Sequence, residues 1–220
     1  RTSLELFLDS VTWSANSDFR QLFLADETYL NGRLAKFYGF DMPANSPFKN
    51  VKWEADKRSG VITNPYMLSS LAYMAETSPI HRGVFVGRGM LGITIKPPME
   101  AFTPIAPDLH PSLTTRERVI LQTKPTACVA CHGLINPLGF PLESFDAIGR
   151  YRAQDRGKPV DTTGAYLDKA GAKHSFAQVA DMARFIRESP EARDAFVAIW
   201  GILRPHLTGM KAQTPRLWRT

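Results

Sequence analysis

Residues 123–140 read TKPTACVACHGLINPLGF, and this stretch holds both cysteines of the 220-residue chain. Cys128 and Cys131 are three positions apart, and His132 follows the second cysteine directly. Residues at positions i and i+3 lie on one face of a helical turn, so both sulfur atoms can point to the same side with the imidazole next to them. The stretch therefore predicts a site in which two thiols and one histidine act together.

Three kinds of site remain open for this pattern. A thioredoxin-type dithiol needs a strand of a βαβ unit before its helix, and the sequence predicts no such strand here. Structural zinc takes about four protein ligands, usually from two knuckles, and the chain has no second pair of cysteines. A c-type haem uses all three residues, because the thiols bond to the porphyrin vinyl groups and the imidazole binds the iron. We favour one covalent haem c.

The composition is that of a globular chain with a sizeable core. Hydrophobic residues make up 44% and charged residues 22%, and no run approaches the roughly 18 apolar residues of a membrane helix. We therefore expect no membrane span. The opening residues RTSLELFLDSV lack the basic start, apolar stretch and cleavage site of a signal peptide. We expect Arg1 to be an internal boundary and the chain to be a fragment or a processed product.

The charge is moderately basic. Lys and Arg number 27 against 21 Asp and Glu, which gives a net charge of +6. An excess of this kind favours an anionic or acidic partner at low salt, but a solvated basic surface is the better explanation. No more than two basic residues are consecutive, and no nucleic-acid motif is present. We expect no nucleic-acid partner.

The rest of the sequence predicts a mainly helical fold. Asn64-Pro65 and Ser78-Pro79 each place an N-cap before a proline, and Thr2 to Glu5 and Thr114 to Glu117 read as capping boxes. We expect helices at the start of the chain, over 18–40, from 65, from 79, from 114, from 175 and from 189 to about 207. Residues 96–111 hold five prolines and predict an extended loop, and residues 157–176 predict a small hairpin.

The segment directly after the cysteines reads as a tight turn. Asn136-Pro137-Leu138-Gly139-Phe140 contains a proline that fixes φ and a glycine that permits a positive φ. In this interpretation Phe140 returns from the turn to pack on the porphyrin.

Longer motifs around the cysteines carry a family resemblance. They are TSPIHRG at 77–83, CVACHGLINPLGF at 128–140 and LESFDAIGRYR at 142–152. With them the chain resembles the cytochrome c-like proteins of planctomycetes, whose modules are known as domains of unknown function 1592, 1588 and 1585. The resemblance places the tail of the first at about 1–40, the second at about 50–150 and the third at about 155–215.

The resemblance implies a fold and an organisation. The fold class is mainly α, with a cytochrome c-like helical haem domain, a small β-hairpin and a C-terminal helical module. We expect the end of an upstream domain at 1–45, the haem domain at 46–153 and the small module at 154–220. Family members are longer, exported and often carry another haem motif upstream. A periplasmic or otherwise exported protein follows, with a redox partner protein or a missing N-terminal part that carries a second haem.

Further residues are candidates for the haem environment. Met99 in the proline-rich loop is a candidate for the sixth iron ligand, and His81 in the helix from 79 could bind the iron or a haem propionate, although each also suits an ordinary structural role. Arginines could donate charge-assisted hydrogen bonds to the haem propionates, and the candidates are Arg82, Arg150 and Arg152.

The sequence thus favours a c-type cytochrome module that transfers single electrons within a larger oxidoreductase. The alternative is a catalytic haem protein of the peroxidase or oxygenase kind, with an open or weakly ligated iron. The sequence does not decide between an electron carrier and an enzyme.

Overall fold

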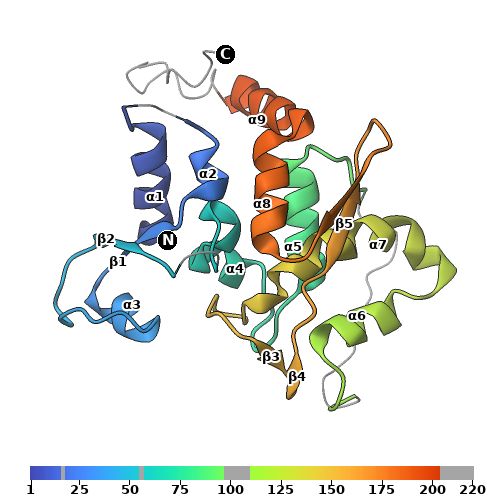
Figure 1. The fold of residues 1–220 in the computed structure, drawn as a ribbon, viewed down its shortest axis with the longest axis horizontal. Coiled ribbons are helices and arrows are strands. Elements are labelled where there is room, and N and C mark those ends of the chain that lie inside the picture. The colour runs from blue at the N-terminus through green and yellow to red at the C-terminus, as the bar shows by residue number, and fades with distance from the viewer. Residues whose placement is uncertain (16–17, 55–56, 97–109, 204–220) are drawn as a thin grey trace.

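Helices dominate the computed structural model, which describes residues 1–15, 18–54, 57–96 and 110–203 (Figure 1). In these ranges the strands form two-stranded antiparallel sheets. The prediction of a mainly α chain with small β elements is confirmed. Among the described residues, no helix has both the length and the apolar character needed to span a bilayer.

The N-terminal part combines three helices with one strand pair. Its elements are α1 (Thr2–Thr12), α2 (Gln21–Leu24), β1 (Glu27–Leu30), α3 (Gly32–Phe37) and β2 (Lys49–Lys52). The helix predicted over 18–40 is wrong at its centre, because residues 27–30 pair with β2 and alternate between half-buried and buried positions. The predicted capping box at Thr2 is also wrong. Arg1 is the N-cap, and its Nε donates to Glu5 over 2.7 Å.

The next part carries the two proline-started helices. Its elements are η1 (Gly60–Thr63), α4 (Pro65–Ser70), α5 (Pro79–Val84) and the π-helical turn η2 (Phe85–Met90). Both predicted N-caps are confirmed. Asn64 accepts a hydrogen bond from the backbone N–H of Tyr66 at 3.0 Å, and Ser78 accepts one from that of His81 at 3.3 Å. Most of the predicted proline-rich loop lies outside the described residues.

The helices α6 (Thr115–Gln122) and α7 (Thr126–Gly139) follow, and the capping box from Thr114 to Glu117 is confirmed. The predicted turn at 136–140 is wrong, because α7 continues through Pro137. Gly139 has a φ of −87°, so it does not serve a left-handed turn. Instead it lets α7 approach α5, since a Cβ there would overlap the carbonyl oxygen of Pro79.

The C-terminal part contains the predicted hairpin and two helices. Its elements are η4 (Phe140–Ser144), β3 (Gln154–Asp155), β4 (Lys158–Pro159), β5 (Gly164–Leu167), β6 (Lys173–Phe176), α8 (Val179–Glu188) and α9 (Pro190–Leu203). The hairpin is confirmed as the antiparallel pair β5–β6. The cap predicted at Ser175 is wrong, since Ser175 belongs to β6. Gln178 and Asp181 form the capping box of α8 instead.

One core joins the three predicted segments. Figure 1 shows α5 and α8 at the centre, with α1 and α2 on one side and β5, α7 and α6 on the other. A single cluster of buried apolar side chains takes members from each segment, among them Phe23, Ile62, Leu138, Met182 and Ile186. The helix that carries the cysteines is therefore anchored in the main core.

Candidate functional site

The cysteine stretch forms the N-terminal half of α7, next to α6 (Figure 1). The predicted helical spacing of Cys128 and Cys131 is therefore present in the structure. Both are free thiols: Cys128 is half-buried and Cys131 is exposed. Val129 is 51% exposed, and the other exposed residues of this half are Thr126, Ala127, Ala130 and Gly133. This half of the helix is therefore mostly open to solvent, with Cys131 more exposed than Cys128.

The C-terminal half of α7 is buried against α5. Ile135, Leu138 and Gly139 are buried there. The two backbones come close, because a Cβ on Gly83 of α5 would overlap the carbonyl oxygen of Ile135. Small residues at a helix crossing permit such an approach and fix the position of the helix. The buried half thus holds the exposed half in place.

His132 lies between these two halves and is half-buried. Its Nδ1 is 3.0 Å from Oδ1 of Asn136, one helical turn further on. Nδ2 of Asn136 donates to Oγ1 of Thr123 over 2.9 Å, and that hydroxyl donates to the carbonyl oxygen of Val119 over 2.7 Å. A continuous set of hydrogen bonds therefore links the imidazole on α7 to the backbone of α6.

Large apolar side chains face solvent along the same helix pair. Ile120 is 48% exposed and Leu121 is 43% exposed, both near the C-terminus of α6. With Val129 they give this end of the molecule three exposed aliphatic side chains on two connected helices.

The donor set of this region fits a c-type haem. Two free thiols at positions i and i+3 of one helix precede a histidine whose Nδ1 is occupied by a hydrogen bond. A haem iron takes four ligands from the porphyrin, so it requires only axial ligands from the protein. In the described part of the chain no group of three or more His, Cys, Asp or Glu side chains is placed to hold a metal ion. A site built from one histidine does not need such a group.

Of the two candidates for the sixth iron ligand, the described residues include His81, which is not brought to His132. His81 is exposed, and its ring packs against Tyr73 at a centroid distance of 5.2 Å. Gly83 is the point where α5 approaches α7 closely. His81 lies two positions before it, so the two side chains are roughly 200° apart around α5. His81 therefore faces away from α7. Met99 lies outside the described residues.

The structure gives Arg82 backbone partners rather than an open position. Its side chain is fully buried, and its terminal nitrogens donate to the carbonyl oxygens of Leu142, Phe145 and Asp146. Nη1 also lies 3.3 Å from Oε1 of Glu143. We leave Arg82 out of the proposed haem site, because these contacts occupy its terminal nitrogens inside the core.

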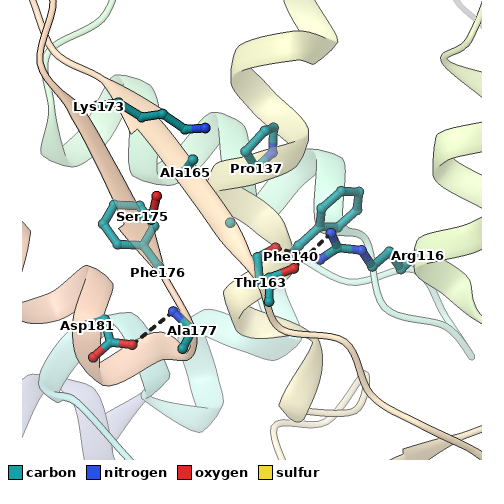
Figure 2. Close-up of a pocket in the computed structure, with 11 residues that line it drawn as sticks. Arg116, Pro137, Phe140, Thr163, Ala165, Lys173, Ser175, Phe176, Ala177 and Asp181 are labelled. Atoms are coloured by element: carbon teal, nitrogen blue, oxygen red, sulfur yellow. Dashed lines mark hydrogen bonds between the residues drawn. The ribbon is translucent and has the colours of Figure 1, made fainter.

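Arg150, Arg152 and Phe140 also have partners of their own. Arg150 is exposed and pairs with Asp146 at 2.9 Å, and Arg152 contacts Glu143 and Asp155, each at 3.0 Å. Phe140 is buried. The porphyrin contact predicted for it assumed the turn at 136–140. In the structure the guanidinium carbon of Arg116 lies 4.0 Å from the centroid of the Phe140 ring (Figure 2).

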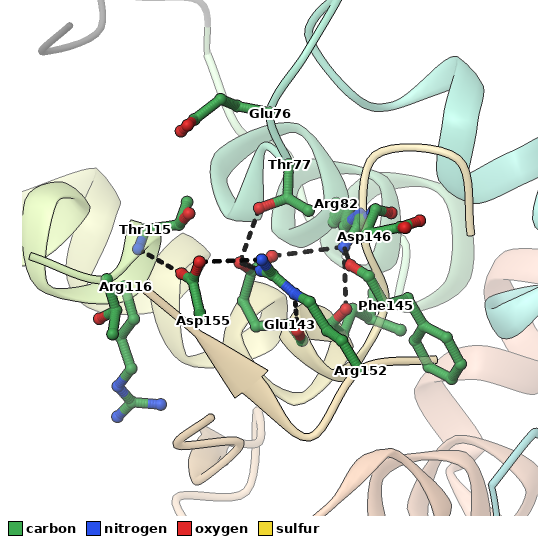
Figure 3. Close-up of polar contacts among 12 residues, drawn as sticks. Glu76, Thr77, Arg82, Thr115, Arg116, Glu143, Phe145, Asp146, Arg152 and Asp155 are labelled. Atoms are coloured by element: carbon green, nitrogen blue, oxygen red, sulfur yellow. Dashed lines mark hydrogen bonds and ion pairs between the residues drawn. The ribbon is translucent and has the colours of Figure 1, made fainter. Parts of the chain in front are cut away.

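The buried carboxylate of Glu143 is the centre of a polar network that sequence reasoning missed (Figure 3). Thr77 donates to it over 2.7 Å, and Arg82 and Arg152 both pair with it. Burial raises the pKa of Glu143, while the two arginines and Thr77 oppose the rise. Burial also lowers the pKa of Arg82, and Glu143 opposes that change. The signal was an acidic residue inside the apolar stretch GFPLESF.

A cavity of about 780 Å³ opens on another side of α7 (Figure 2). It lies between Pro137, the β5–β6 hairpin and Arg116 of α6. Burial lowers the pKa of the Arg116 guanidinium, and Asp161 opposes this effect from 3.2 Å. Pro137 is five positions after His132, roughly 140° around the helix. The cavity is therefore not on the side of α7 that carries the imidazole.

Comparison with known families supports the module assignments made from the motifs. Residues 58–155, which include both cysteines and His132, match the family model described as PSCyt3, a protein of unknown function (DUF1588). Residues 1–40 match the model described as PSD4, a protein of unknown function (DUF1592). No curated protein and no solved structure matches the chain. The third module, at about 155–215, stays a prediction.

Proposed function

We propose that this chain binds one c-type haem through thioether bonds from Cys128 and Cys131, with His132 as the axial iron ligand, and that it transfers single electrons. The single observation that carries the proposal is the hydrogen bond from His132 to Asn136. It occupies Nδ1 at 3.0 Å and leaves Nε2, the other ring nitrogen, for a metal. The cytochrome-like name of the family model that covers this site supports the same interpretation.

In this proposal, different residues of α6 and α7 have different roles in haem binding. The buried crossing with α5 fixes the helix, and the two cysteines would hold the porphyrin against the exposed N-terminal half. Ile120, Leu121 and Val129 offer apolar surface for the porphyrin to cover. When bound, the haem supplies a one-electron redox couple.

The proposed setting is a larger exported protein. The matches to two family models in one chain support a multi-module organisation. We include a redox partner protein, or an upstream part with a second haem, as the source or acceptor of electrons. The net charge of +6 would favour an acidic partner at low ionic strength.

Catalysis at an open iron is the second candidate function. His81 faces away from α7, so this sequence candidate does not supply a sixth ligand in the described structure. An iron without a strong sixth ligand permits reaction with peroxide or oxygen. Residue 99 therefore distinguishes the two functions: Met99→Leu should change the spin state only if the thioether is the ligand.

The test is to produce the chain with a c-type haem maturation system and record reduced-minus-oxidised spectra in the native and the denatured state. We expect haem that stays with the polypeptide after denaturation, and no attached haem in the double variant Cys128→Ser/Cys131→Ser. A low-spin ferric spectrum without reaction to peroxide supports electron transfer. A high-spin ferric spectrum with rapid reaction to peroxide contradicts it in favour of catalysis. Haem that dissociates on denaturation contradicts the covalent site.

A further inference from the structure

The hydroxyl of Thr123 sets the direction of the hydrogen bonds that end at His132. This hydroxyl has one proton, and its neighbour Val119 presents a carbonyl oxygen at 2.7 Å, which can only accept. In the structure the hydroxyl proton of Thr123 is therefore donated to the carbonyl oxygen of Val119. Toward Asn136, at 2.9 Å, the same oxygen can only act as an acceptor.

The side-chain amide of Asn136 is oriented as a consequence. An acceptor at Thr123 requires the NH₂ group of Asn136 on that side, which places Oδ1 toward His132 at 3.0 Å. Oδ1 carries no proton, so the proton in this last hydrogen bond must belong to Nδ1 of the imidazole. In the neutral ring Nε2 is then left with its lone pair, which is the form that binds a metal.

Thr123 and Asn136 are both well shielded from water. Each residue is 7% exposed. In the reversed amide, the hydroxyl of Thr123 would have to give up its 2.7 Å hydrogen bond to the carbonyl oxygen of Val119, which also accepts the backbone N–H of Thr123 at 3.0 Å, and donate to Asn136 instead. Keeping the hydrogen bond from Thr123 to Val119 therefore requires this orientation of Asn136 and the Nδ1–H tautomer of His132.

We propose that Asn136 and Thr123 are positioning residues that hold the neutral imidazole of His132 in the Nδ1–H tautomer and tune it as an iron ligand. The tuning rests on the proposed haem function, whereas the tautomer does not. Three hydrogen bonds that point the same way polarise one another, and a hydrogen bond from the distant ring nitrogen makes the imidazole a stronger electron donor. A stronger donor stabilises ferric over ferrous iron and lowers the midpoint potential.

The tautomer is read directly by long-range ¹H–¹⁵N NMR of the histidine ring in the 220-residue chain before haem attachment. In the neutral ring of the wild-type chain we expect a protonated Nδ1 and an unprotonated Nε2 for His132. Thr123→Val keeps the shape of the side chain and removes the hydroxyl, so the preference for Nδ1–H should weaken. Thr123→Ser keeps the hydroxyl and should restore it. A protonated Nε2 in the wild-type chain overturns the proposal, as does a tautomer that is the same in all three proteins.

The tuning is read from the midpoint potential of the haem-loaded chain. Asn136→Leu removes the acceptor, so the potential should rise, whereas Asn136→Asp offers a charged acceptor and should lower it. We expect the ferric-to-ferrous ratio at a fixed applied potential to fall about tenfold in Asn136→Leu, which corresponds to about 59 mV for a one-electron couple. Thr123→Val should give a smaller rise, and Thr123→Ser should resemble the wild type.

The outcomes separate this inference from the function on which it depends. Shifts of the midpoint potential of opposite sign for Asn136→Leu and Asn136→Asp support tuning by the hydrogen bond from His132. A merely structural role would not give shifts whose sign follows the charge of the acceptor. Equal potentials in these two variants overturn the tuning. A chain to which no haem attaches contradicts the proposed function, and the tautomer measured by NMR still decides whether Asn136 and Thr123 orient His132.

Discussion

The two halves of α7 differ in their surroundings. The C-terminal half, from Ile135 to Gly139, is packed against α5 and leads into η4, where the carboxylate of Glu143 is satisfied by three side-chain donors. The N-terminal half carries Cys128 and Cys131 on a surface with exposed aliphatic groups. The C-terminal half is thus packed mainly against other parts of the chain. The N-terminal half is the part to which we propose that a haem is attached.

This difference shows how a rigid site can be built from an exposed helix. A haem ligand must keep its orientation while the iron changes its charge, and positioning of this kind comes from a supporting set of packed and hydrogen-bonded neighbours. Here the packed half fixes the helix axis, and Asn136 and Thr123 fix the ring of His132. In the proposed function, the exposed half is the part that binds the haem.

The largest expected change in stability comes from removing the buried carboxylate of Glu143, which follows the C-terminal half of α7. Glu143→Ala leaves Arg82 fully buried without its ion-pair partner, and loss of one member of such a pair costs about 3–5 kcal/mol. Denaturant unfolding measures this change. The matched control is Glu54→Ala, which breaks the exposed pair with Lys57 and should change the free energy of unfolding by about 1 kcal/mol or less. Equal effects of the two variants would mean that the network adds no more than a surface pair.

The same substitution at two glycines of α7 should have opposite effects in the chain without haem. Gly139→Ala places a methyl group against the carbonyl oxygen of Pro79, and overpacking of this kind costs about 1–3 kcal/mol. Gly133→Ala meets no atom within 4 Å and should stabilise the helix by about 0.5–1 kcal/mol. Thermal unfolding of both variants checks the signs. If Gly133→Ala also destabilised the chain, the exposed half would be packed against something in solution.

The start of α6 gives a smaller effect that depends on pH. The hydrogen bond from Lys158 lowers the pKa of Glu117 below its ordinary value of 4.5. A carboxyl group with a lowered folded-state pKa binds protons more readily in the unfolded chain. Its contribution is therefore present above pH 4.5 and is lost as the pH falls through the folded-state pKa.

Glu117→Gln tests this contribution, because the amide oxygen keeps an acceptor for Thr114 without the charge. At neutral pH the variant should be less stable than the wild type by about 1 kcal/mol or less. The two unfolding temperatures should converge as the pH falls below 4.5. Lys158→Met should give the same convergence. A difference that stays constant from pH 7 to acid would show that the charge contributes nothing.

Local signals predicted those parts of the fold that have local causes. The caps at Asn64, Ser78 and Thr114 depend on side chains that bond within a few residues, and the structure confirms all three. The spacing of Cys128 and Cys131 likewise needs only one helical turn. The hairpin at 164–176 was also accessible, because turn residues and strand residues alternate over a short distance.

The failures arise where a distant segment decides the local structure. Residues 27–30 form a strand because β2, some twenty residues away, offers backbone partners. Gly139 reads locally as a turn residue, but α5 determines its role by passing close to it. The same limit applies to the site. Thr123 and Asn136 meet only when α6 and α7 are folded, so no local pattern marks them as partners.

The central claim is tested most directly by the intact mass of the polypeptide after expression with a c-type haem maturation system, measured under denaturing conditions. The account predicts the mass of the polypeptide plus one haem, and the mass of the polypeptide alone for Cys128→Ser/Cys131→Ser. A wild-type chain that repeatedly shows only the mass of its amino acids, in a host that attaches haem to a known cytochrome c, would contradict the account.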